Sequence, residues 1–481
     1  MPQRVIVIGG GLAGLAASEA LSARGRSVTL LESRPRLGGR ASSFEDRVTG
    51  ETVDNCQHVT MGCCTNFDRF CQRAGLESLL RTEHELTFIG LDRHRNSMKS
   101  GSWPAPTHLL RSFNRFSFLE RADRWALARG LAALAKSDER QLRGMRFDNW
   151  LAAHGQTENT LNRFWHVVLV SALSESLDRI DAAHARKVFV DGFLANRTGW
   201  LVRMPHVPLD ELYGQELRDH LAGQGVEVRL GIGVRRLLIE SDRIAGVELR
   251  SGERIEADEF VLAVPHYRLR AMLPEALADR PEFQRLEELE TSPITSIHFW
   301  FDQPIMNEPH AVLIDRLSQW VFNRSILNSR QSSSEAGYYY QVVISASREL
   351  SDMNAQETIE AVRRELGDIW PLARSARLLH ARRVTEHRAV FSVTPGCEEL
   401  RLPQQSPIEN LQFAGDWTKT GWPATMEGAV RSGYLAAENI LRRGGEPVGL
   451  VAPDLPIARL SRWLWGLEAN NGRTGDSPTH R

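Results

Sequence analysis

A glycine-rich run near the start of the chain has the residue types that bind phosphate. Residues 9–14 read GGGLAG and follow the apolar run Val5–Ile8. In such a run Gly9 allows a tight turn, Gly11 lets the backbone approach a pyrophosphate, and Gly14 lets a helix and a strand pack closely. Backbone N–H groups at the start of the following helix would face the phosphates. The alternative is a glycine-rich turn that binds nothing.

An acidic residue at a characteristic distance indicates what the phosphates belong to. A helical pattern over Leu15–Leu21 leads to a second apolar run, Val28–Leu31, which is followed by Glu32. Glu32 lies about twenty residues after Gly11, where dinucleotide-binding folds carry the acid that binds the ribose. Glutamate there favours an adenosine ribose without a 2′-phosphate. The sequence therefore predicts a strand–turn–helix–strand unit that binds a dinucleotide.

A second pair of glycines indicates whether the cofactor is a flavin or a nicotinamide nucleotide. Gly38 and Gly39 stand directly before Arg40, shortly after the ribose acid. A nicotinamide enzyme has no use for this second turn, whereas the bulkier FAD needs extra backbone donors and a cation near its pyrophosphate. The sequence predicts FAD as the cofactor.

Residues 9–40 resemble the start of the flavin amine oxidase and phytoene desaturase superfamily, which implies that Arg40 contacts the FAD diphosphate. Two later stretches continue the resemblance. Val226–Leu230 and Gly233–Leu237 resemble a strand pair that touches the adenine, with the backbone of Val234 as the expected contact. Phe260–Pro265 resembles the strand that re-enters the FAD domain.

The last part of the resemblance lies near the C-terminus. Asn410–Asp416 reads as a strand ending in Gly-Asp, and Pro423–Ala429 opens a helix that continues to Leu441. The resemblance implies that Asp416 faces the ribityl and phosphate groups, and that the backbone at Thr425 and Met426 lies along the isoalloxazine ring. The N-terminus of a helix there can stabilise negative charge on a reduced flavin. The expected cofactor-binding residues are Gly9, Gly11, Leu12, Ala13, Gly14, Glu32, Gly39, Arg40, Val234, Gly415, Asp416, Thr425 and Met426.

The position of these motifs at the start, middle and end of the chain predicts a discontinuous nucleotide domain. We expect an α/β fold, flavin amine oxidase-like, with a Rossmann-like FAD-binding domain formed by residues 1–75, 200–285 and 405–447. An α+β substrate domain would consist of 76–199 and 286–404, and 448–481 would be an amphipathic segment with a polar tail. Within the substrate domain, patterns predict strands at Thr295–Phe301 and Tyr338–Ser345, a helix at Asn354–Leu366 and a loop tip at 331–334, and residues 470–481 a disordered tail.

Composition excludes several classes of protein. The chain has 481 residues, 42% of them hydrophobic, and a formal net charge of −1, which excludes a disordered or collagen-like chain and argues against nucleic-acid binding. Cys56, Cys63, Cys64 and Cys71 lie in one stretch, but their spacing differs from that of zinc ligands, so no metal is expected. Cys64 and Cys71, about two helical turns apart, are expected to share a buried face.

Two regions rich in aromatic residues and arginine suggest contact with a membrane surface. They span residues 103–136, helical from His108 to Lys136, and 457–467. Such a composition suits a helix in a membrane interface, although both regions also suit ordinary helices packed on the substrate domain. No stretch is apolar enough to predict a transmembrane helix. Few cysteines suit a reducing compartment, so we expect a cytoplasmic protein at the inner face of the cell membrane.

The most distinctive stretch is VDNCQHV at 53–59, followed by MGCCTN at 61–66. With the terminal motifs, it resembles the squalene-associated FAD-dependent enzymes of bacterial hopanoid synthesis, the hydroxysqualene dehydroxylases. That family implies that reduced FAD delivers hydride to hydroxysqualene, the hydroxyl leaves as water, and squalene results. His58 could protonate the leaving hydroxyl, and Asp54 could orient or recharge His58. Alternatively, both residues only shape the flavin pocket. Many superfamily relatives have glycine where Cys56 stands, at a site where positive φ would disfavour cysteine.

Other activities share parts of this pattern. A carotenoid-type desaturase or isomerase would share the flavin, the long apolar isoprenoid substrate and the membrane docking. An amine oxidase or protoporphyrinogen oxidase is a further alternative, and Cys397 could tether the flavin as in some amine oxidases. The last alternative is not an enzyme but a carrier of prenylated proteins that binds no flavin. Purified protein of that kind would be colourless. Family analogy suggests functional coupling to upstream prenyl-transferring enzymes, and the sequence predicts no oligomeric state.

Overall fold

Strands from distant parts of the chain form one parallel sheet in the computed structural model, which describes residues 2–328 and 337–467. Side chains of the central strand alternate between two cores, with Val5 and Val7 in one and Ile6 and Ile8 in the other, as in a strand buried on both faces. The expected α/β fold with a discontinuous Rossmann-like domain is confirmed. In order across the sheet, the strands are β10 (Glu227–Leu230), β2 (Ser27–Glu32), β1 (Arg4–Ile8), β14 (Glu259–Leu262) and β20 (Leu411–Phe413).

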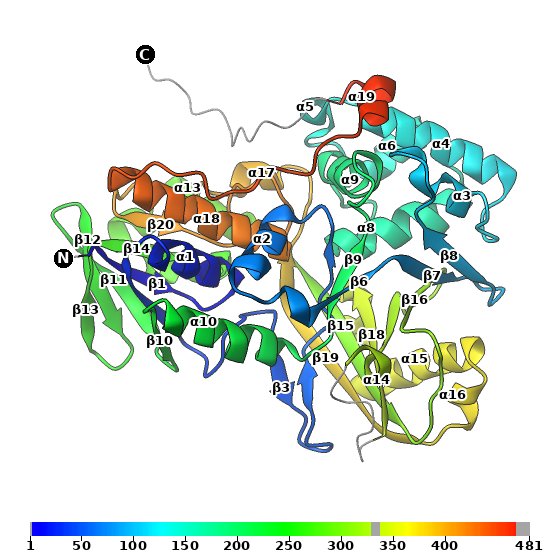
Figure 1. The fold of residues 1–481 in the computed structure, drawn as a ribbon, viewed down its shortest axis with the longest axis horizontal. Helices are drawn as coiled ribbons and strands as arrows, with labels where there is room; N and C mark the ends of the chain where they lie inside the picture. Colours follow the sequence, from blue (N-terminus) through cyan, green and yellow to red (C-terminus); the bar gives the residue numbers. More distant parts are fainter. Residues whose placement is uncertain (1, 329–336, 468–481) are drawn as a thin grey trace.

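Two helices from opposite ends of the chain pack against each other beside this sheet. They are α1 (Leu12–Ser22) and α18 (Met426–Arg443), and α10 (Leu217–Gly223) lies next to β10 (Figure 1). The helices approach closely at Gly433, where a Cβ would stand 2.2 Å from the carbonyl oxygen of Ala13. α1 begins three residues before the helical pattern at Leu15, because Gly11 already acts as its N-cap.

The two segments expected to form a strand pair near the adenine do not pair with each other. β10 joins the parallel sheet, whereas β11 (Val234–Glu240) forms a hairpin with β12 (Arg243–Leu249), which pairs with β13 (Arg254–Glu256). Ser241 and Asp242 link β11 to β12 and both have positive φ, as a tight two-residue hairpin turn requires. Because of this tight turn, β11 pairs with β12 and not with β10.

A seven-stranded sheet forms the second half of the molecule. The strands expected at Thr295–Phe301 and Tyr338–Ser345 belong to it, and the first begins earlier, at Thr291. The expected helix is α15 (Ala355–Ile369), which Asn354 begins with a capping box. Its apolar face packs on the sheet through Ile359, Val362 and Leu366. The strand order is β19 (Leu378–Phe391), β15 (Thr291–Phe301), β18 (Tyr338–Ser345), β17 (Trp320–Asn323), β16 (His310–Leu313), β7 (Glu85–Ile89) and β8 (Arg95–Lys99).

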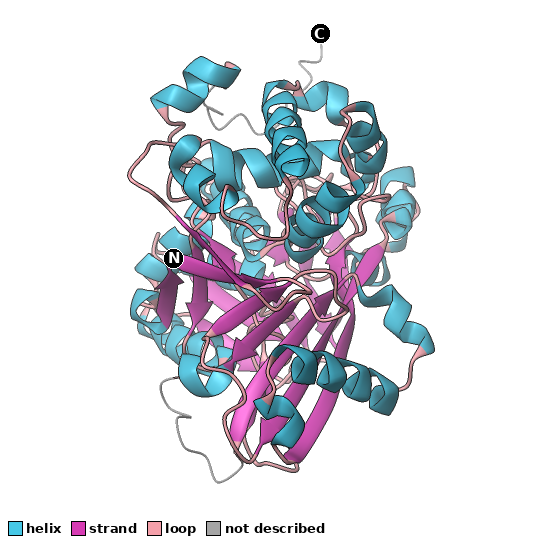
Figure 2. Ribbon diagram, turned by 90° about the vertical axis from the view of Figure 1, so that its right-hand side faces the viewer, coloured by secondary structure: helices cyan, strands magenta, loops and turns pink. Residues whose placement is uncertain are grey.

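Most of the remaining helices gather on one side of the strands (Figure 2). The region from His108 to Lys136, expected as one amphipathic helix, is divided. Glu120 and Asp123 form a capping box that starts a new helix, so a short helix and a turn precede it. The helices of this lobe are α3 (Leu110–Phe113), α4 (Arg121–Lys136), α5 (Glu139–Leu142), α6 (Phe147–Ala153), α7 (Glu158–Thr160), α8 (His166–Leu173) and α9 (Ala182–Phe189).

Smaller elements connect the two halves. Cys64 and Cys71, at the start and near the end of α2 (Thr65–Arg73), are both buried in one core, as expected. None of the helices in the described part of the chain combines the length and the apolar composition needed to cross a bilayer. The loop tip expected at 331–334 and the tail expected at 470–481 lie outside the described residues. The connecting elements are β3 (Ser43–Glu45), β4 (Thr52–Asp54), β5 (Thr60–Met61), β6 (Leu80–Glu83), β9 (Val202–Pro205), α17 (Cys397–Leu400) and α19 (Arg459–Trp465).

Candidate functional site

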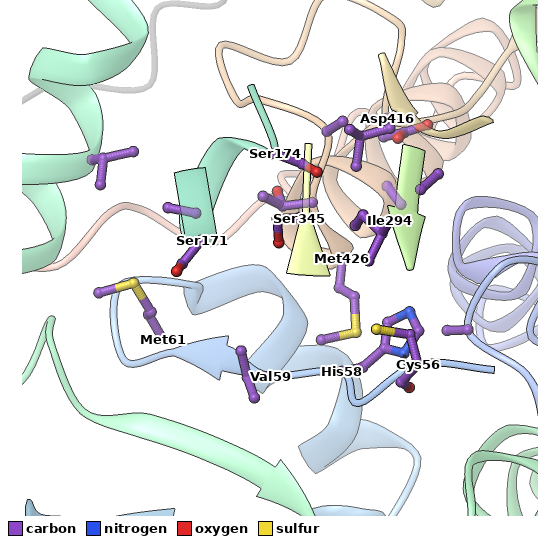
Figure 3. Close-up of a pocket in the computed structure, with 18 of the residues that line it drawn as sticks. Cys56, His58, Val59, Met61, Ser171, Ser174, Ile294, Ser345, Asp416 and Met426 are labelled. Carbon is purple, nitrogen blue, oxygen red and sulfur yellow. Dashed lines mark hydrogen bonds between the residues drawn. The ribbon is translucent and has the colours of Figure 1, made fainter. Parts of the chain in front are cut away.

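One large cavity, of about 1030 Å³, runs between the parallel sheet and the helical lobe (Figure 3). Its volume lies at the upper end of the range for small-molecule sites, roughly 300–1,000 Å³. The cavity brings together nearly all of the residues that the sequence assigned to the cofactor. Those that line it are Gly9, Gly11, Leu12, Ala13, Glu32, Gly39, Arg40, Val234, Gly415, Asp416, Thr425 and Met426.

The glycine run has the backbone geometry of a phosphate cradle. Gly9 has a φ of +112°, and a Cβ on it would stand 2.3 Å from the carbonyl oxygen of Ala263. Gly14 does not line the cavity, and a Cβ there would lie 1.9 Å from the carbonyl oxygen of Gly9. Gly14 thus serves the close packing of helix and strand. At Gly11, by contrast, the nearest atom to a Cβ is 3.9 Å away, which leaves the side facing the cavity open.

Positive groups face the cavity at this end. The first turn of α1 has no side-chain cap and no acidic residue, so its N–H groups are available to an anion. Arg40 donates to the Asp416 carboxylate at 2.6 Å and to the carbonyl oxygen of Ala389 at 2.7 Å. Burial opposes its charge, but Asp416 outweighs burial and raises the pKa of Arg40. A permanently charged guanidinium beside helix N–H groups fits the diphosphate of FAD.

Glu32 is held in place by the backbone. One carboxylate oxygen accepts from the N–H of Gly10 and the other from the N–H of Arg34, both at 2.7 Å. Oε1 also accepts from the Ser33 hydroxyl at 3.1 Å, whereas Oε2, which accepts from Gly10, keeps a second lone pair that can accept a ribose hydroxyl. The expected contact with the adenosine ribose therefore remains compatible with this geometry, and it stays a prediction.

The N-terminus of α18 faces the middle of the cavity. Thr425 caps the helix by accepting from the N–H of Gly428, and Met426 lines the cavity beside it. Glu427 was not among the residues assigned a role from the sequence. It is fully buried and accepts from the backbone N–H groups of Asn66 and Phe67 at 2.9 and 2.7 Å. Its carboxylate caps α2 and ties the C-terminal motif to the stretch that follows His58.

A second residue not assigned a role from the sequence, Arg401, holds the loop after β20. Its buried guanidinium donates to the carbonyl oxygens of Asp416 and Trp417 at 3.1 and 3.3 Å, and to that of Thr418. Glu398 forms an ion pair with Arg401 and accepts from His184 at 3.2 Å. The cavity-lining residues Asp416 and Trp417 are therefore fixed from behind by buried charges.

His58 lines the cavity with its ring (Figure 3). Its Nδ1 lies 3.0 Å from the carbonyl oxygen of Cys56. A carbonyl oxygen only accepts, so Nδ1 carries the hydrogen and the neutral ring has its lone pair on Nε2. Burial lowers the pKa of His58, although the Cys56 carbonyl and Asp54 oppose this effect. Near pH 7 the ring is therefore set to accept a proton rather than to donate one.

Asp54 does not orient His58, contrary to the sequence-based expectation. Its carboxylate is buried and pairs with Arg324 at 3.1 Å, and it accepts from Ser43 and from the N–H of Leu209. Arg324 comes from α14 (Arg324–Leu327), far along the chain, so the sequence could not show it as the partner. Asp54 positions the backbone around the 53–59 stretch instead, and it does not line the cavity.

The structure shows the backbone conformation of Cys56 and the location of Cys397. Cys56 lines the cavity and is not among the residues with positive φ, so cysteine causes no backbone strain where relatives have glycine. Cys397 is buried in α17 and does not line the cavity. A flavin in this cavity would therefore not lie beside Cys397. This argues against a covalent bond between Cys397 and the flavin.

Beyond these residues the cavity becomes apolar. Its walls come from the helical lobe and from the face of the seven-stranded sheet that carries Ile294, Val343 and Ser345. This half of the cavity is therefore lined mainly by apolar side chains. Apolar residues that line it include Phe113, Leu127, Leu131, Phe164, Val167, Val168, Val188, Phe189, Phe193, Ile294, Val312, Phe322 and Val343.

Comparisons with known proteins agree with this geometry. The chain is 26% identical over 460 residues to the chloroplastic/chromoplastic 15-cis-phytoene desaturase of Solanum lycopersicum, covering 92% of this chain and 78% of that protein. It is 25% identical over 479 residues to the 15-cis-phytoene desaturase of Synechococcus elongatus, covering 92% and 97%. Among solved structures, an oxidoreductase from Methanosarcina mazei has the same fold, with a TM-score of 0.70 at 18% identity and coverage of 89% and 98%.

The family model for flavin containing amine oxidoreductases matches residues 12–441, which is most of the chain. This match includes α1, the whole seven-stranded sheet and all but the last two residues of α18. Together with the phosphate cradle and the cavity beside it, it establishes FAD as the cofactor. The protein belongs to the flavin containing amine oxidoreductase family and is an FAD-dependent oxidoreductase of the phytoene desaturase-like type.

Proposed function

We propose that the protein exchanges a hydride between FAD and a long acyclic isoprenoid. The observation that supports this proposal is the single cavity, which joins the cofactor residues to a long apolar half. Bound FAD supplies the redox chemistry by accepting or donating a hydride at its isoalloxazine ring. The chain supplies the rest, which is an apolar cavity wall and a residue that handles a proton.

Desaturation of a carotenoid precursor is the reaction favoured by the curated relatives, which are phytoene desaturases. The site supports it through His58. When a saturated C–C bond becomes a double bond, one hydrogen leaves as hydride and one as a proton. The lone pair on His58 Nε2 can take that proton, because the Cys56 carbonyl holds the hydrogen of the ring on Nδ1.

Reductive dehydroxylation of hydroxysqualene is the second candidate, and the VDNCQHV stretch favours it. In this reaction the C–O bond breaks, the oxygen leaves as water after taking a proton, and a hydride replaces it at carbon. An allylic cation forms readily in an apolar cavity once the oxygen is protonated or hydrogen-bonded. The reaction needs a hydrogen-bond donor at the oxygen, and neutral His58 does not provide one.

Two anaerobic reactions separate the candidates. Oxidised flavin-loaded protein is mixed with phytoene, and photoreduced protein is mixed with hydroxysqualene. Bleaching of the flavin with a desaturated product supports the first candidate. Reoxidation of the flavin with formation of squalene supports the second. If neither substrate changes the flavin and no product forms, the proposed function is wrong.

Arg40→Ala and His58→Ala are expected to act on different steps. Loss of the Arg40 guanidinium removes a charge-assisted contact of about 1.5–3 kcal/mol, so FAD binding weakens about tenfold to a hundredfold. His58→Ala keeps the cofactor and lowers turnover by about 10² or more, because a general base is lost. The flavin-to-protein ratio and single-turnover kinetics measure the two effects. Equal loss of flavin in both variants would assign His58 to cofactor binding alone.

We also propose that the protein docks on the inner face of the cell membrane. Exposed aromatic side chains, Trp103, Trp125 and Trp463, are 57%, 72% and 79% exposed, and α4 contacts α19. Leu110 and Leu464 line the cavity and are also exposed, so the cavity approaches the surface within this patch. Exposed arginines on the same segments suit anionic lipid. They are Arg111, Arg115, Arg121, Arg129, Arg459 and Arg462.

Replacing both Trp125 and Trp463 by alanine is expected to weaken binding to vesicles with anionic lipid by at least tenfold, since each indole inserts apolar area worth roughly 1.5–3 kcal/mol when buried. Co-sedimentation with the vesicles measures this. Leu372→Ala is a matched control, because Leu372 is 55% exposed and lies on α16 (Leu372–Ser375), away from the patch (Figure 1). Equal binding by the double variant and the control would contradict docking through this patch.

A further inference from the structure

Three serines line the apolar half of the cavity. Ser171 lies on α8, Ser174 follows directly after that helix, and Ser345 ends β18 (Figure 3). Ser345 lies on the same face of its strand as Val343, two residues earlier, which also lines the cavity. Hydroxyl groups are out of place in a cavity for a hydrocarbon, because a donor without a partner there is unfavourable.

The hydroxyl groups are arranged to donate. Ser171 Oγ accepts from Trp320 Nε1 at 3.1 Å, and Ser174 Oγ accepts from the N–H of Ala346 at 3.0 Å. Each oxygen is thereby oriented while its own hydrogen remains to be donated. Within residues 2–328 and 337–467, neither hydroxyl has an acceptor in the protein. A ligand oxygen in the cavity would provide one.

The backbone around Ser174 is held in an unusual conformation. Ser174 and Ala346 have φ values of 53° and 52°, and they hydrogen-bond to each other across the cavity wall. Left-handed residues other than glycine cost roughly 1–3 kcal/mol and persist where the surroundings fix them, often at functional sites. Here the neighbouring residues fix them, because buried Glu175 accepts from both ends of the Arg348 guanidinium at 2.6 and 2.8 Å.

The next residues strengthen this arrangement. Ser392 donates to the same Glu175 carboxylate at 2.6 Å. On the sheet, the Gln319 side chain accepts from the N–H of Ser345 at 2.8 Å and donates to its carbonyl oxygen at 3.0 Å. The three serines are thus carried by a junction between the helical lobe and the sheet that is fixed on both sides.

We propose that Ser171, Ser174 and Ser345 form a hydroxyl-binding subsite, which selects an isoprenoid alcohol over the matching hydrocarbon. The proposal rests on the proposed function in one respect, since it takes a long isoprenoid as the occupant. A serine hydroxyl on this wall that donates to the ligand's oxygen withdraws electron density from the C–O bond and provides the hydrogen bond that neutral His58 does not. Ser171 and Ser174 are the donors, and Ser345 completes the polar wall.

The test measures binding rather than turnover, with oxidised flavin-loaded protein and two probes, hydroxysqualene and squalene, followed by the change in flavin absorbance. We expect the protein to bind the alcohol at least tenfold more tightly than the hydrocarbon. The double variant Ser171→Ala, Ser174→Ala should bring this ratio to about one, while its affinity for squalene stays within about twofold. Ser345→Ala should lower the ratio by a smaller factor.

Val168→Ala is the matched control, because it truncates an apolar residue of the same cavity. This variant should weaken the binding of both probes by a similar factor, so the ratio of the two affinities should stay the same. An unchanged ratio in the double serine variant, with the flavin still bound, would overturn the subsite. Equal binding of both probes by the unaltered protein would overturn the subsite and leave the proposed function intact. If neither probe binds, the subsite is wrong, and the anaerobic reaction with phytoene then decides the proposed function.

Discussion

Arg401→Gln is expected to destabilise the protein by about 3–5 kcal/mol and to reduce its flavin content sharply, because it removes a buried guanidinium that donates to three loop carbonyl groups and pairs with the half-buried Glu398. Arg401 is buried and donates to three consecutive carbonyl groups of the loop that contains Asp416. Burial raises the pKa of Glu398, but the charges of Arg401 and His184 outweigh burial and hold the pKa well below its usual range. In the variant this carboxylate keeps His184 but loses Arg401 as a partner, and the carbonyl groups lose the donor that Arg401 provided.

Chemical unfolding and the flavin-to-protein ratio measure the two effects. Arg442→Gln is the control, since Arg442 is exposed at the end of α18. The double variant Arg401→Gln, Glu398→Gln should recover part of the lost stability, because it removes the uncompensated carboxylate as well. Its flavin content should stay low, because the loop carbonyls remain without their donor. Normal flavin content in Arg401→Gln would show that Arg401 does not position the loop.

Stability is expected to fall steeply as the pH drops from about 6.5 to 4. Burial lowers the pKa of His108, His266 and His310 to about 4 and that of His298 to about 3. In the unfolded chain these rings take up protons near pH 6.5. Between those values the unfolded state binds more protons than the folded state, so the free energy of unfolding rises with pH and is lost on acidification.

Groups whose pKa is raised in the folded state work in the opposite direction, and Asp68 is one of them. Burial raises the pKa of Asp68 to about 6, so the folded state binds one proton more there. For the four histidines and Asp68 together, the difference between unfolded and folded states is about three protons, or about 4 kcal/mol per pH unit between pH 6 and 5. Unfolding by guanidinium at pH 8, 6.5 and 5 measures the slope.

A single substitution tests the origin of this slope. Neither ring nitrogen of His108 has a hydrogen-bond partner in the described part of the chain, so His108→Leu removes no hydrogen bond. The difference in bound protons between the unfolded and folded states, which sets the slope, should fall by about one. The free energy of unfolding at pH 8 should change little. His94→Leu, at an exposed position, should leave the slope unchanged. A stability that is flat between pH 7 and 5 would contradict the prediction.

The cofactor half of the site could be predicted from sequence because its signals are local. Gly9, Gly14 and Glu32 lie within one strand–turn–helix–strand unit, and each has a conformational or chemical requirement that only certain residues meet. The pairing of β10 and β11 could not be predicted in the same way. A neighbouring hairpin turn at Ser241 and Asp242 decides it, and a resemblance in order along the chain does not specify strand partners.

The chemistry of the rest of the site depends on contacts between distant residues. Asp54 was expected to interact with His58. Its carboxylate instead accepts a hydrogen bond from Arg324, which is 270 residues away in the sequence. The state of His58 follows from a backbone carbonyl and from burial, and neither is visible as a sequence pattern. Arg401 and the three cavity serines are single residues in unremarkable surroundings. Only the tertiary structure brings them to the loop and the cavity wall.

The placement of β14 between β1 and β20 has a consequence for how the protein is made. The central sheet needs the first strand, a strand from the middle and one that is translated near the end. During synthesis, β1 therefore waits for about half of the chain before its second neighbour, β14, arrives, and β14 in turn waits for β20 near the end of the chain. Such late, non-local pairing is slow. Nascent chains that stall before β20 lack α18 as well, so they lack part of the cofactor site.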